Sequence, residues 1–271
     1  MLHPKFCWIL LRRTILVAFG LTVSAFATAI APKDWTAIAS AQAQTPAELT
    51  MFVQQLDQAA SQEDLSGVIQ AYSGDLVHGD GLTRDDLEAA LVQFWEQYDE
   101  LSYETEIKTW ERTGTGYTTK TETTITGTRD LGDQALVLTA TLTAEQTLVD
   151  GQIISQDILS EQSSVSSGSN PPELEVNLPE QVNPGEQFYF DAIVLEPLGE
   201  RLLLGMAIDE DINSTSYTVP SAIEFDVLTS GGLFKVGQAP DTPGQRWLSA
   251  VVIRDDGITG TTRRLQVAPG E

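Results

Sequence analysis

Cysteine, histidine and basic residues are scarce in this chain of 271 residues. It has one cysteine, Cys7, and two histidines, His3 and His78, and its 15 Lys and Arg stand against 39 Asp and Glu, a formal net charge of −24. One cysteine cannot form a paired-cysteine zinc site, and His3 and His78 are too far apart in the sequence for the H-E-x-x-H zinc motif. The acidic excess repels phosphate backbones and anionic lipid headgroups, so we expect neither nucleic-acid binding nor binding to a membrane surface.

The first 43 residues have the three regions of a secretory signal peptide. Basic residues, among them Arg12 and Arg13, precede an apolar run at residues 14–30, and the following stretch ends in Ala41-Gln42-Ala43, an A-x-A cleavage pattern. We predict a signal peptide at 1–43 and an exported protein in the periplasm or another extracytoplasmic compartment, without stable membrane insertion after cleavage. An apolar run of this length is also near the minimum for a span, so an uncleaved N-terminal anchor is the alternative.

Cleavage after Ala43 would remove Cys7, four of the 15 basic residues and one of the 39 acidic residues. The remaining 228 residues would hold 11 basic and 38 acidic residues, a net charge of −27, and would fold without disulfides. Small polar residues followed by two prolines, at Ser163–Pro172, are typical of a linker. We therefore predict one domain at 44–165, a linker at 166–172 and a second domain at 173–271.

Three segments of the first predicted domain begin with helix start signals. Thr45–Glu48, Ser61–Asp64 and Thr83–Asp86 each place a hydroxyl three positions before an acid, the pattern of a capping box, ahead of apolar residues at helical spacing. From residue 101 the apolar period changes to two, and Asp150-Gly151 is a two-residue hairpin signal. The predicted strands of this antiparallel meander are residues 101–110, 117–128, 135–148 and 153–161.

Four short fragments in this order resemble the NTF2-like superfamily, which includes nuclear transport factor 2, SnoaL and ketosteroid isomerase. They are Tyr72-Ser73-Gly74-Asp75, Gly79-Asp80-Gly81, Phe94-Trp95 and Asp150-Gly151-Gln152-Ile153-Ile154. The resemblance covers about residues 45–165 and implies a cone-shaped α+β barrel. It implies little about activity, because such cones serve as enzymes, ligand binders and docking modules. It also implies a possible homodimer through the outer sheet face, which we expect at Tyr117–Thr128.

Residues 173–271 have the pattern of an all-β domain. About seven short strands without a cysteine pair resemble an immunoglobulin-like sandwich, and Pro184-Gly185-Glu186 and Asp256-Gly257 resemble turns of bacterial Ig-like modules. The strand candidates are residues 174–178, 187–195, 201–208, 222–228, 233–237, 245–254 and 258–267. The expected fold class is therefore α+β, with an N-terminal cone-shaped NTF2-like α+β barrel and a C-terminal all-β immunoglobulin-like sandwich.

His78 is the one histidine after residue 43, and it lies between Asp75 and Asp80. It is either a general base that a carboxylate such as Asp80 orients, or a solvated loop histidine. Isomerase chemistry in the cone would also need a buried carboxylate base and an oxyanion donor. Asp157 and Glu106 are the candidates for that carboxylate.

Aromatic residues of the first domain give a second set of candidates. They are either the lining of a ligand pocket at the open end of the cone or plain core. The residues are Tyr72, Trp95, Tyr98, Tyr103 and Trp110.

Asp209, Asp211 and Asn213 follow the D-x-D-x-N start of a calcium loop. The sixth position is Ser214 where the EF-hand template has Gly, and the twelfth is Pro220 where it has Glu, so that template fails. A solvated acidic turn and weak calcium binding are the two interpretations that stay open.

These observations predict an exported, non-catalytic binding protein. It would use the pocket or sheet face of the NTF2-like domain and the Ig-like module to bind a small apolar ligand or a protein, without a cofactor. Two observations lead to this prediction. The sequence contains no recognisable set of catalytic residues, and the C-terminal domain resembles modules that usually bind other molecules. The alternative is a small-molecule isomerase or dehydratase-like enzyme with its site in the cone.

Overall fold

The computed structural model describes residues 44–197, 199, 201–219 and 224–270. The predicted signal peptide at 1–43 lies outside these residues. Within them, no helix is both long and apolar enough to cross a membrane.

Three helices lie in the N-terminal part: α2 (Ala47–Ser61), α3 (Leu65–Gln70) and α4 (Arg84–Trp95). The capping box predicted at the start of α4 is confirmed, because Thr83 and Asp86 each accept a hydrogen bond from the other's backbone N–H.

The other two helix starts differ from the prediction. Pro46 occupies the N-cap of α2 without a side-chain bond, and α3 begins after Asp64, whose carboxylate accepts from the Gly67 N–H at 3.1 Å. A carboxylate at position 64 is thus the cap itself and not the third residue of a helix capped by Ser61.

The predicted four-strand meander is confirmed, with longer strands than expected. Its strands are β2 (Glu100–Thr113), β3 (Gly116–Asp130), β4 (Ala135–Val149) and β5 (Gln152–Gly168). Asp150 and Gly151 have φ of 50° and 77°, as a two-residue hairpin turn between right-twisted strands requires. A further strand, β1 (Tyr72–His78), was not predicted and pairs in parallel with β5.

The C-terminal part is built from short strands and one 3₁₀ turn. They are β6 (Leu174–Asn177), β7 (Gln181–Val182), β8 (Gln187–Val194), β9 (Leu203–Asp211), η1 (Ser214–Tyr217), β10 (Asp226–Leu228), β11 (Gly232–Gln238), β12 (Gly244–Arg254) and β13 (Gly257–Val267).

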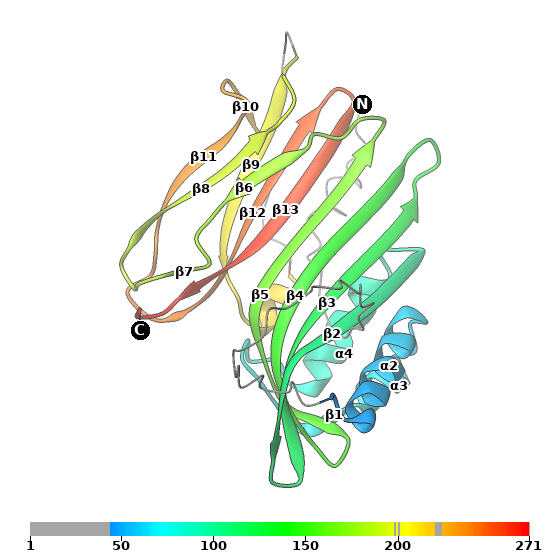
Figure 1. Cartoon of the computed structure of the whole chain (residues 1–271). Helices are drawn as coiled ribbons and strands as arrows, with labels where there is room; N and C mark the ends of the chain where they lie inside the picture. Colours follow the sequence, from blue (N-terminus) through cyan, green and yellow to red (C-terminus); the bar gives the residue numbers. More distant parts are fainter. Residues whose placement is uncertain (1–43, 198, 200, 220–223, 271) are drawn as a thin grey trace, which may run out of the picture.

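The expected fold class, a cone-shaped α+β barrel followed by a separate sandwich, is wrong. Strands hold 56% and helices 17% of the described residues, and strands of both halves share one sheet of ten strands (Figure 1). Its order is β10-β9-β12-β13-β5-β4-β3-β2, with β1 beside β5 and β7 beside β13. A sheet of three strands, β11-β8-β6, forms a second layer at the C-terminal end. The fold is therefore mostly antiparallel β-sheet.

The pairing of β5 with β13 is what joins the two halves. Seven register pairs run from Gly168 opposite Gly257 to Gln162 opposite Arg263, while the same part of β5 also pairs with β4. Residues 166–168, which the sequence placed in a linker, therefore belong to a strand that is hydrogen-bonded on both edges. The serine-rich composition of this segment did not predict a strand. The hydrogen bonds that pair β5 with its neighbours come from backbone N–H and C=O groups, which every side-chain composition leaves available.

The two faces of the large sheet carry different cores. One face packs against the helices and holds the largest apolar cluster, with Phe94, Ile125 and Val165 among its members. The opposite face of β12 and β13 packs against the three-stranded sheet through residues such as Phe190 and Leu265. A third, smaller cluster around Met206 and Ile258 lies on the helix-side face. Ile258 pairs with Ser167, which is two residues from Val165 on β5, so Ile258 points to the same face as Val165.

Gly168 is the residue whose replacement most directly tests the β5–β13 join. Its φ is 122°, and a Cβ there would lie 2.5 Å from the Asp256 carbonyl oxygen. We expect G168A to lower the free energy of unfolding by about 2–4 kcal/mol in urea denaturation. G151A, also at positive φ but with open space around its Cβ, should cost about 1 kcal/mol. Equal losses would contradict the steric role of Gly168.

Candidate functional site

Of the predicted catalytic residues, Asp80 lies in a buried ionic cluster around Arg264, and His78 lies beside that cluster. The cluster sits on the helix-side face of the large sheet, where Arg264 of β13 faces Trp247 of β12 in register. Glu161 of β5 completes this layer. Asp80, in the loop after β1, covers it from the N-terminal half.

Every N–H of the Arg264 guanidinium has an acceptor. Nη1 and Nη2 donate to the two Asp80 carboxylate oxygens at 2.8 and 2.9 Å. Nη2 and Nε also donate to Glu161 Oε2 at 3.0 and 3.3 Å, and Nη1 donates to Gln245 Oε1 at 3.2 Å. These five bonds exhaust the five donors of an arginine side chain. The bidentate Asp80 contact is the strong planar form of this pair.

Two aromatic side chains close the cluster. The Trp247 indole N–H donates to Glu161 Oε2 at 2.7 Å, and the Tyr217 hydroxyl of η1 donates to Asp80 Oδ2. The Tyr217 and Trp247 rings meet edge to face, with centroids 4.8 Å apart. These apolar walls exclude water, so the cluster is a low-dielectric site.

Burial and charge move the two carboxylates in opposite directions. Burial alone would raise the pKa of Asp80, but its hydrogen bonds to Arg264 and the guanidinium charge outweigh burial and lower it. Burial raises the pKa of Glu161 in spite of the same arginine. One guanidinium thus holds two carboxylates, and Glu161 is the one that burial drives toward its neutral form.

The structure places His78 beside this cluster but not as a base oriented by a carboxylate. Its side chain is 8% exposed, and its Nδ1 accepts from the backbone N–H of Asp80 at 3.1 Å. Nε2 lies 3.3 Å from the Gln156 side-chain amide. Burial lowers the pKa of His78, which favours the neutral imidazole. The Asp80 carboxylate itself is occupied by Arg264 and Tyr217.

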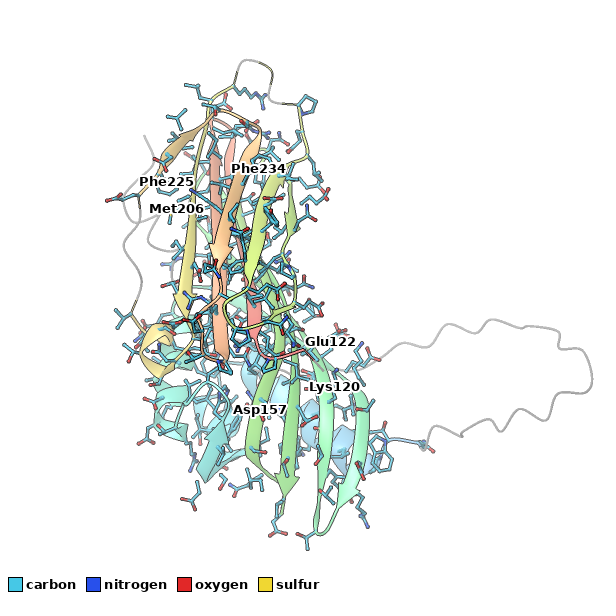
Figure 2. All side chains as sticks on the ribbon, turned by 90° about the vertical axis from the view of Figure 1, so that its left-hand side faces the viewer. Lys120, Glu122, Asp157, Met206, Phe225 and Phe234 are labelled. Atoms are coloured by element: carbon cyan, nitrogen blue, oxygen red, sulfur yellow. The ribbon has the colours of Figure 1, made fainter. Side chains whose placement is uncertain are left out.

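The other candidate carboxylates lie outside the cluster. Asp157 is exposed on β5 (Figure 2), and its Oδ1 lies against Gly79. Glu106 is ion-paired with Lys108.

Four of the five aromatic candidates are core residues. Tyr72, Trp95, Tyr98 and Tyr103 are buried in the helix-side core, where the Trp95 indole N–H donates to the Tyr103 hydroxyl at 2.9 Å. Trp110 is partly buried and packs edge to face on Tyr117.

The predicted calcium residues have other partners in the structure. Asp209 and Asp211 lie in β9, and both bind Arg246. Asn213 caps η1 by accepting from the Ser216 N–H at 3.1 Å. In the described part of the chain, no three His, Cys, Asp or Glu side chains gather as a metal site would need.

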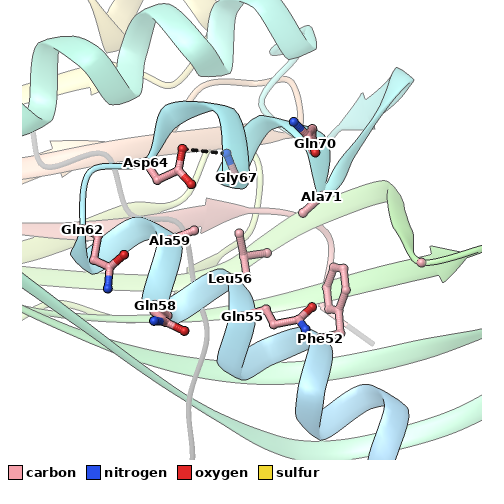
Figure 3. Close-up of a pocket in the computed structure, with 11 residues that line it drawn as sticks. Phe52, Gln55, Leu56, Gln58, Ala59, Gln62, Asp64, Gly67, Gln70 and Ala71 are labelled. Atoms are coloured by element: carbon pink, nitrogen blue, oxygen red, sulfur yellow. Dashed lines mark hydrogen bonds between the residues drawn. The ribbon is translucent and has the colours of Figure 1, made fainter.

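A pocket of about 390 Å³ lies between α2 and α3 (Figure 3). Amide side chains dominate its polar lining, and its one carboxylate, Asp64, is used to cap α3. Its lining residues are Phe52, Gln55, Leu56, Gln58, Ala59, Gln62, Asp64, Gly67, Gln70, Ala71 and Gly151. None of the predicted catalytic or aromatic residues lines it.

Asp57 of α2 is a partly buried carboxyl that sequence reasoning missed. Its two oxygens accept from the Thr105 backbone N–H at 3.2 Å and from the Thr105 hydroxyl at 3.1 Å. Burial raises the pKa of Asp57 from 3.8 to about 8, although the hydrogen bond from the Thr105 hydroxyl opposes the rise. Its position three residues before the end of an amphipathic stripe gave no sign that the carboxyl faces the sheet.

Comparison with known proteins gives a family match for the C-terminal part alone. Residues 169–268 match a family described as "Domain of unknown function (DUF8623)". No curated protein matches the chain.

The solved structures to which part of the chain is similar include the following three, all with low TM-scores. A variant of Rv3472, a function unknown protein from Mycobacterium tuberculosis, is 14% identical over 41% of this chain and 68% of its own, with a TM-score of 0.34. AclR, a putative hydroxylase from Streptomyces galilaeus, is 20% identical over 40% and 84%, with a TM-score of 0.30. An LEH-like epoxide hydrolase from M. tuberculosis is 18% identical over 41% and 80%, with a TM-score of 0.29. Scores of this size decide neither the fold nor an activity.

Removing Arg264 should destabilise the protein strongly, because it leaves the Asp80 and Glu161 carboxylates buried without a counter-charge. We expect R264M to lower the free energy of unfolding by about 3–5 kcal/mol in urea denaturation at pH 7. Arg201 is the matched control, since its ion pair with Asp256 is partly exposed to solvent and Asp256 keeps its pairing with Arg254. R201M should therefore cost less than about 1 kcal/mol. Similar losses of stability in both variants would show that the buried cluster contributes no more to the free energy of unfolding than a surface ion pair does.

Asp57 should give the stability a specific pH dependence. Because its pKa is about 8 in the folded state and 3.8 in the reference state, the folded protein keeps a proton that the unfolded chain releases. Its contribution is therefore present below about pH 4 and is lost as the pH rises to about 8. Relative to D57N, the wild type should lose on the order of 1 kcal/mol per pH unit in this window. Parallel stability curves for the two proteins would refute a carboxyl that stays protonated in the folded state.

Proposed function

We propose that this chain is an exported, non-catalytic binding protein that contacts a protein partner through the outer face of its three-stranded sheet. The observation that carries the proposal is an apolar patch on that face. Tyr189 of β8 is 63% exposed, and Phe234 and Val236 of β11 are 53% and 59% exposed. Tyr189 and Val236 are register partners, and Phe234 lies two residues along on the same face. Exposed aromatic and aliphatic side chains grouped in this way mark contact surfaces.

The charges around the apolar patch favour a basic partner. Asp191 lies directly opposite Phe234, and Glu175 of β6 lies opposite Ile193 on the same face. The whole chain has a net charge of −24, so a second copy docked on this acid-flanked patch would meet like-charge repulsion. A partner with an apolar centre and a lysine- or arginine-rich rim complements both features.

The buried cluster supports binding over catalysis. An isomerase or dehydratase would need a carboxylate free to move a proton at a cavity. The Asp80 carboxylate is held by Arg264 and Tyr217, and His78 accepts a backbone N–H. Tyr72, Trp95 and Tyr103 fill the core beneath the helices. These groups stabilise the fold, and their contacts leave neither the Asp80 carboxylate nor the His78 Nδ1 free to move a proton.

The outer face of β3 is a different surface from the apolar patch. Figure 2 shows Lys120 and Glu122 on this strand, away from Phe234. Lys108 bridges Glu106 and Glu122 there. A homodimer through this polar face stays a prediction, which light scattering of the purified protein tests.

The apolar patch is tested with the double variant Y189S/F234S. The native protein, carrying a photo-crosslinking residue at position 187, should capture one basic protein from envelope extracts. The purified partner should bind the double variant at least about tenfold more weakly, because the exposed aromatic contact is lost. V77S/V137S removes exposed apolar residues of β1 and β4 and is the matched control that should keep full affinity. Equal binding by Y189S/F234S and the native protein would sink the proposal.

A further inference from the structure

Arg263 of β13 is a partly buried arginine without a carboxylate partner among the residues that the structure describes. Its Nη1 donates to the Ser163 carbonyl at 3.4 Å, to the Thr261 hydroxyl at 3.0 Å and to the Thr262 carbonyl at 3.2 Å. All of these acceptors are neutral. By contrast, Arg112, Arg201, Arg246, Arg254 and Arg264 each contact at least one carboxylate.

The free donors of Arg263 lie along one edge of its guanidinium. Nε and Nη2 have no acceptor in the described part of the protein, whereas Nη1, on the other edge, carries all three internal bonds. The Nε–Nη2 edge is a planar fork whose two N–H groups match the two oxygens of a carboxylate. The internal bonds of Nη1 hold this fork in a fixed orientation.

Arg263 lines a pocket of about 120 Å³ between β5, β13 and the segment that follows β6. One side of the pocket is polar, with Ser160 and Gln162 beside Arg263, and the other side is apolar. The lining residues are Ser160, Glu161, Gln162, Val176, Leu178, Pro179, Glu180, Arg263 and Arg264. The volume is well below that of a pocket for a drug-sized ligand, so it has room for one compact acidic group and a short apolar tail.

The electrostatics of the pocket favour an anion. Burial lowers the pKa of Arg263, and no neighbouring acid raises it again. A partly desolvated cation without a counter-charge is costly. Two acids line the pocket with Arg263. Glu161 is already bound by Arg264 and Trp247. Glu180 is exposed and forms no ion pair with Arg263, and its backbone carbonyl accepts from the Gln266 N–H at 2.9 Å. Its charge weakens anion binding and disfavours a dianion such as phosphate.

We propose that the Arg263 pocket is a binding site for a carboxylate that carries a short apolar tail. The carboxylate lies against the Nε–Nη2 edge of Arg263, and the tail contacts Val176, Leu178 and Pro179. Two sources present this chemistry: a free short-chain carboxylic acid, and the C-terminal carboxylate of a peptide. The site is independent of the apolar patch around Phe234, because it is lined by residues of β5, β13 and 176–180 and shares none with that patch.

The test measures binding of butanoate to the purified protein by calorimetry and by the NMR shift of the Arg263 Nε–H. Butanoate should bind, and butanamide, which has the same shape without the charge, should bind at least about tenfold more weakly. R263Q should lower the association constant for butanoate at least about tenfold, and R263K should lower it less, because it keeps the charge but loses the fork. R129Q, which removes an arginine bound only to backbone carbonyls, is the matched control and should bind as the native protein does.

E180Q keeps the test decisive even if R263Q disturbs the fold. Glu180 is exposed, so its replacement should leave the structure intact and raise the butanoate association constant about two- to threefold. N-acetyl-glycyl-valine distinguishes the two sources, and its C-terminal amide is the uncharged control. Tighter binding of this peptide acid than of butanoate assigns the site to a peptide C-terminus. Tighter binding of butanoate assigns it to a free carboxylic acid. Equal affinity for butanoate and butanamide, or no change in E180Q, would overturn the proposal.

Discussion

The backbone pairing of β5 with β13 is the constraint on which the rest of the structure depends. Through it, strands of the N-terminal meander and of the C-terminal half form one sheet. Its register also fixes the ionic cluster, because Arg264 follows the Gln162–Arg263 pair and so meets Glu161 on the helix-side face. A slip of one residue would turn Arg264 to the opposite face, away from Asp80. The main-chain ladder thus determines where the charged side chains lie.

Local structure was largely readable from the sequence, whereas pairing between distant segments was not. The Thr83 capping box and the Asp150-Gly151 turn are signals within four residues of chain, and both are present in the structure. The strand β1 escaped prediction because Tyr72 continues the apolar spacing of α3 and the parallel partner of β1 lies in β5. The expected linker failed for the same reason, since residues 166–168 are shown to be strand by their pairing with β4 and with β13, which is about 90 residues further along the chain.

The site was predictable only in part. His78 and Asp80 stood out because they are a lone histidine and an acid two residues apart, but their chemistry is set by Arg264, which is 184 residues from Asp80 in the chain. The one available signal was the pair Arg263-Arg264 inside a predicted strand of a chain poor in basic residues. Alternation along a strand places such neighbours on opposite faces. One of them therefore meets Asp80 and Glu161, and the other lies on the face toward the three-stranded sheet, where it forms no ion pair with a described residue.

The late position of β13 in the chain has a consequence for how the protein folds. The Thr261 hydroxyl and the Ser163 carbonyl that it binds are 98 residues apart, and contacts of such long range are slow to form. Synthesis proceeds from the N-terminus, so the outer edge of β5 is complete before β13 exists. During that interval the strand offers unpaired N–H and C=O groups to any other extended chain. The newly made protein is then most exposed to aggregation at the strand that becomes one of its best-protected elements.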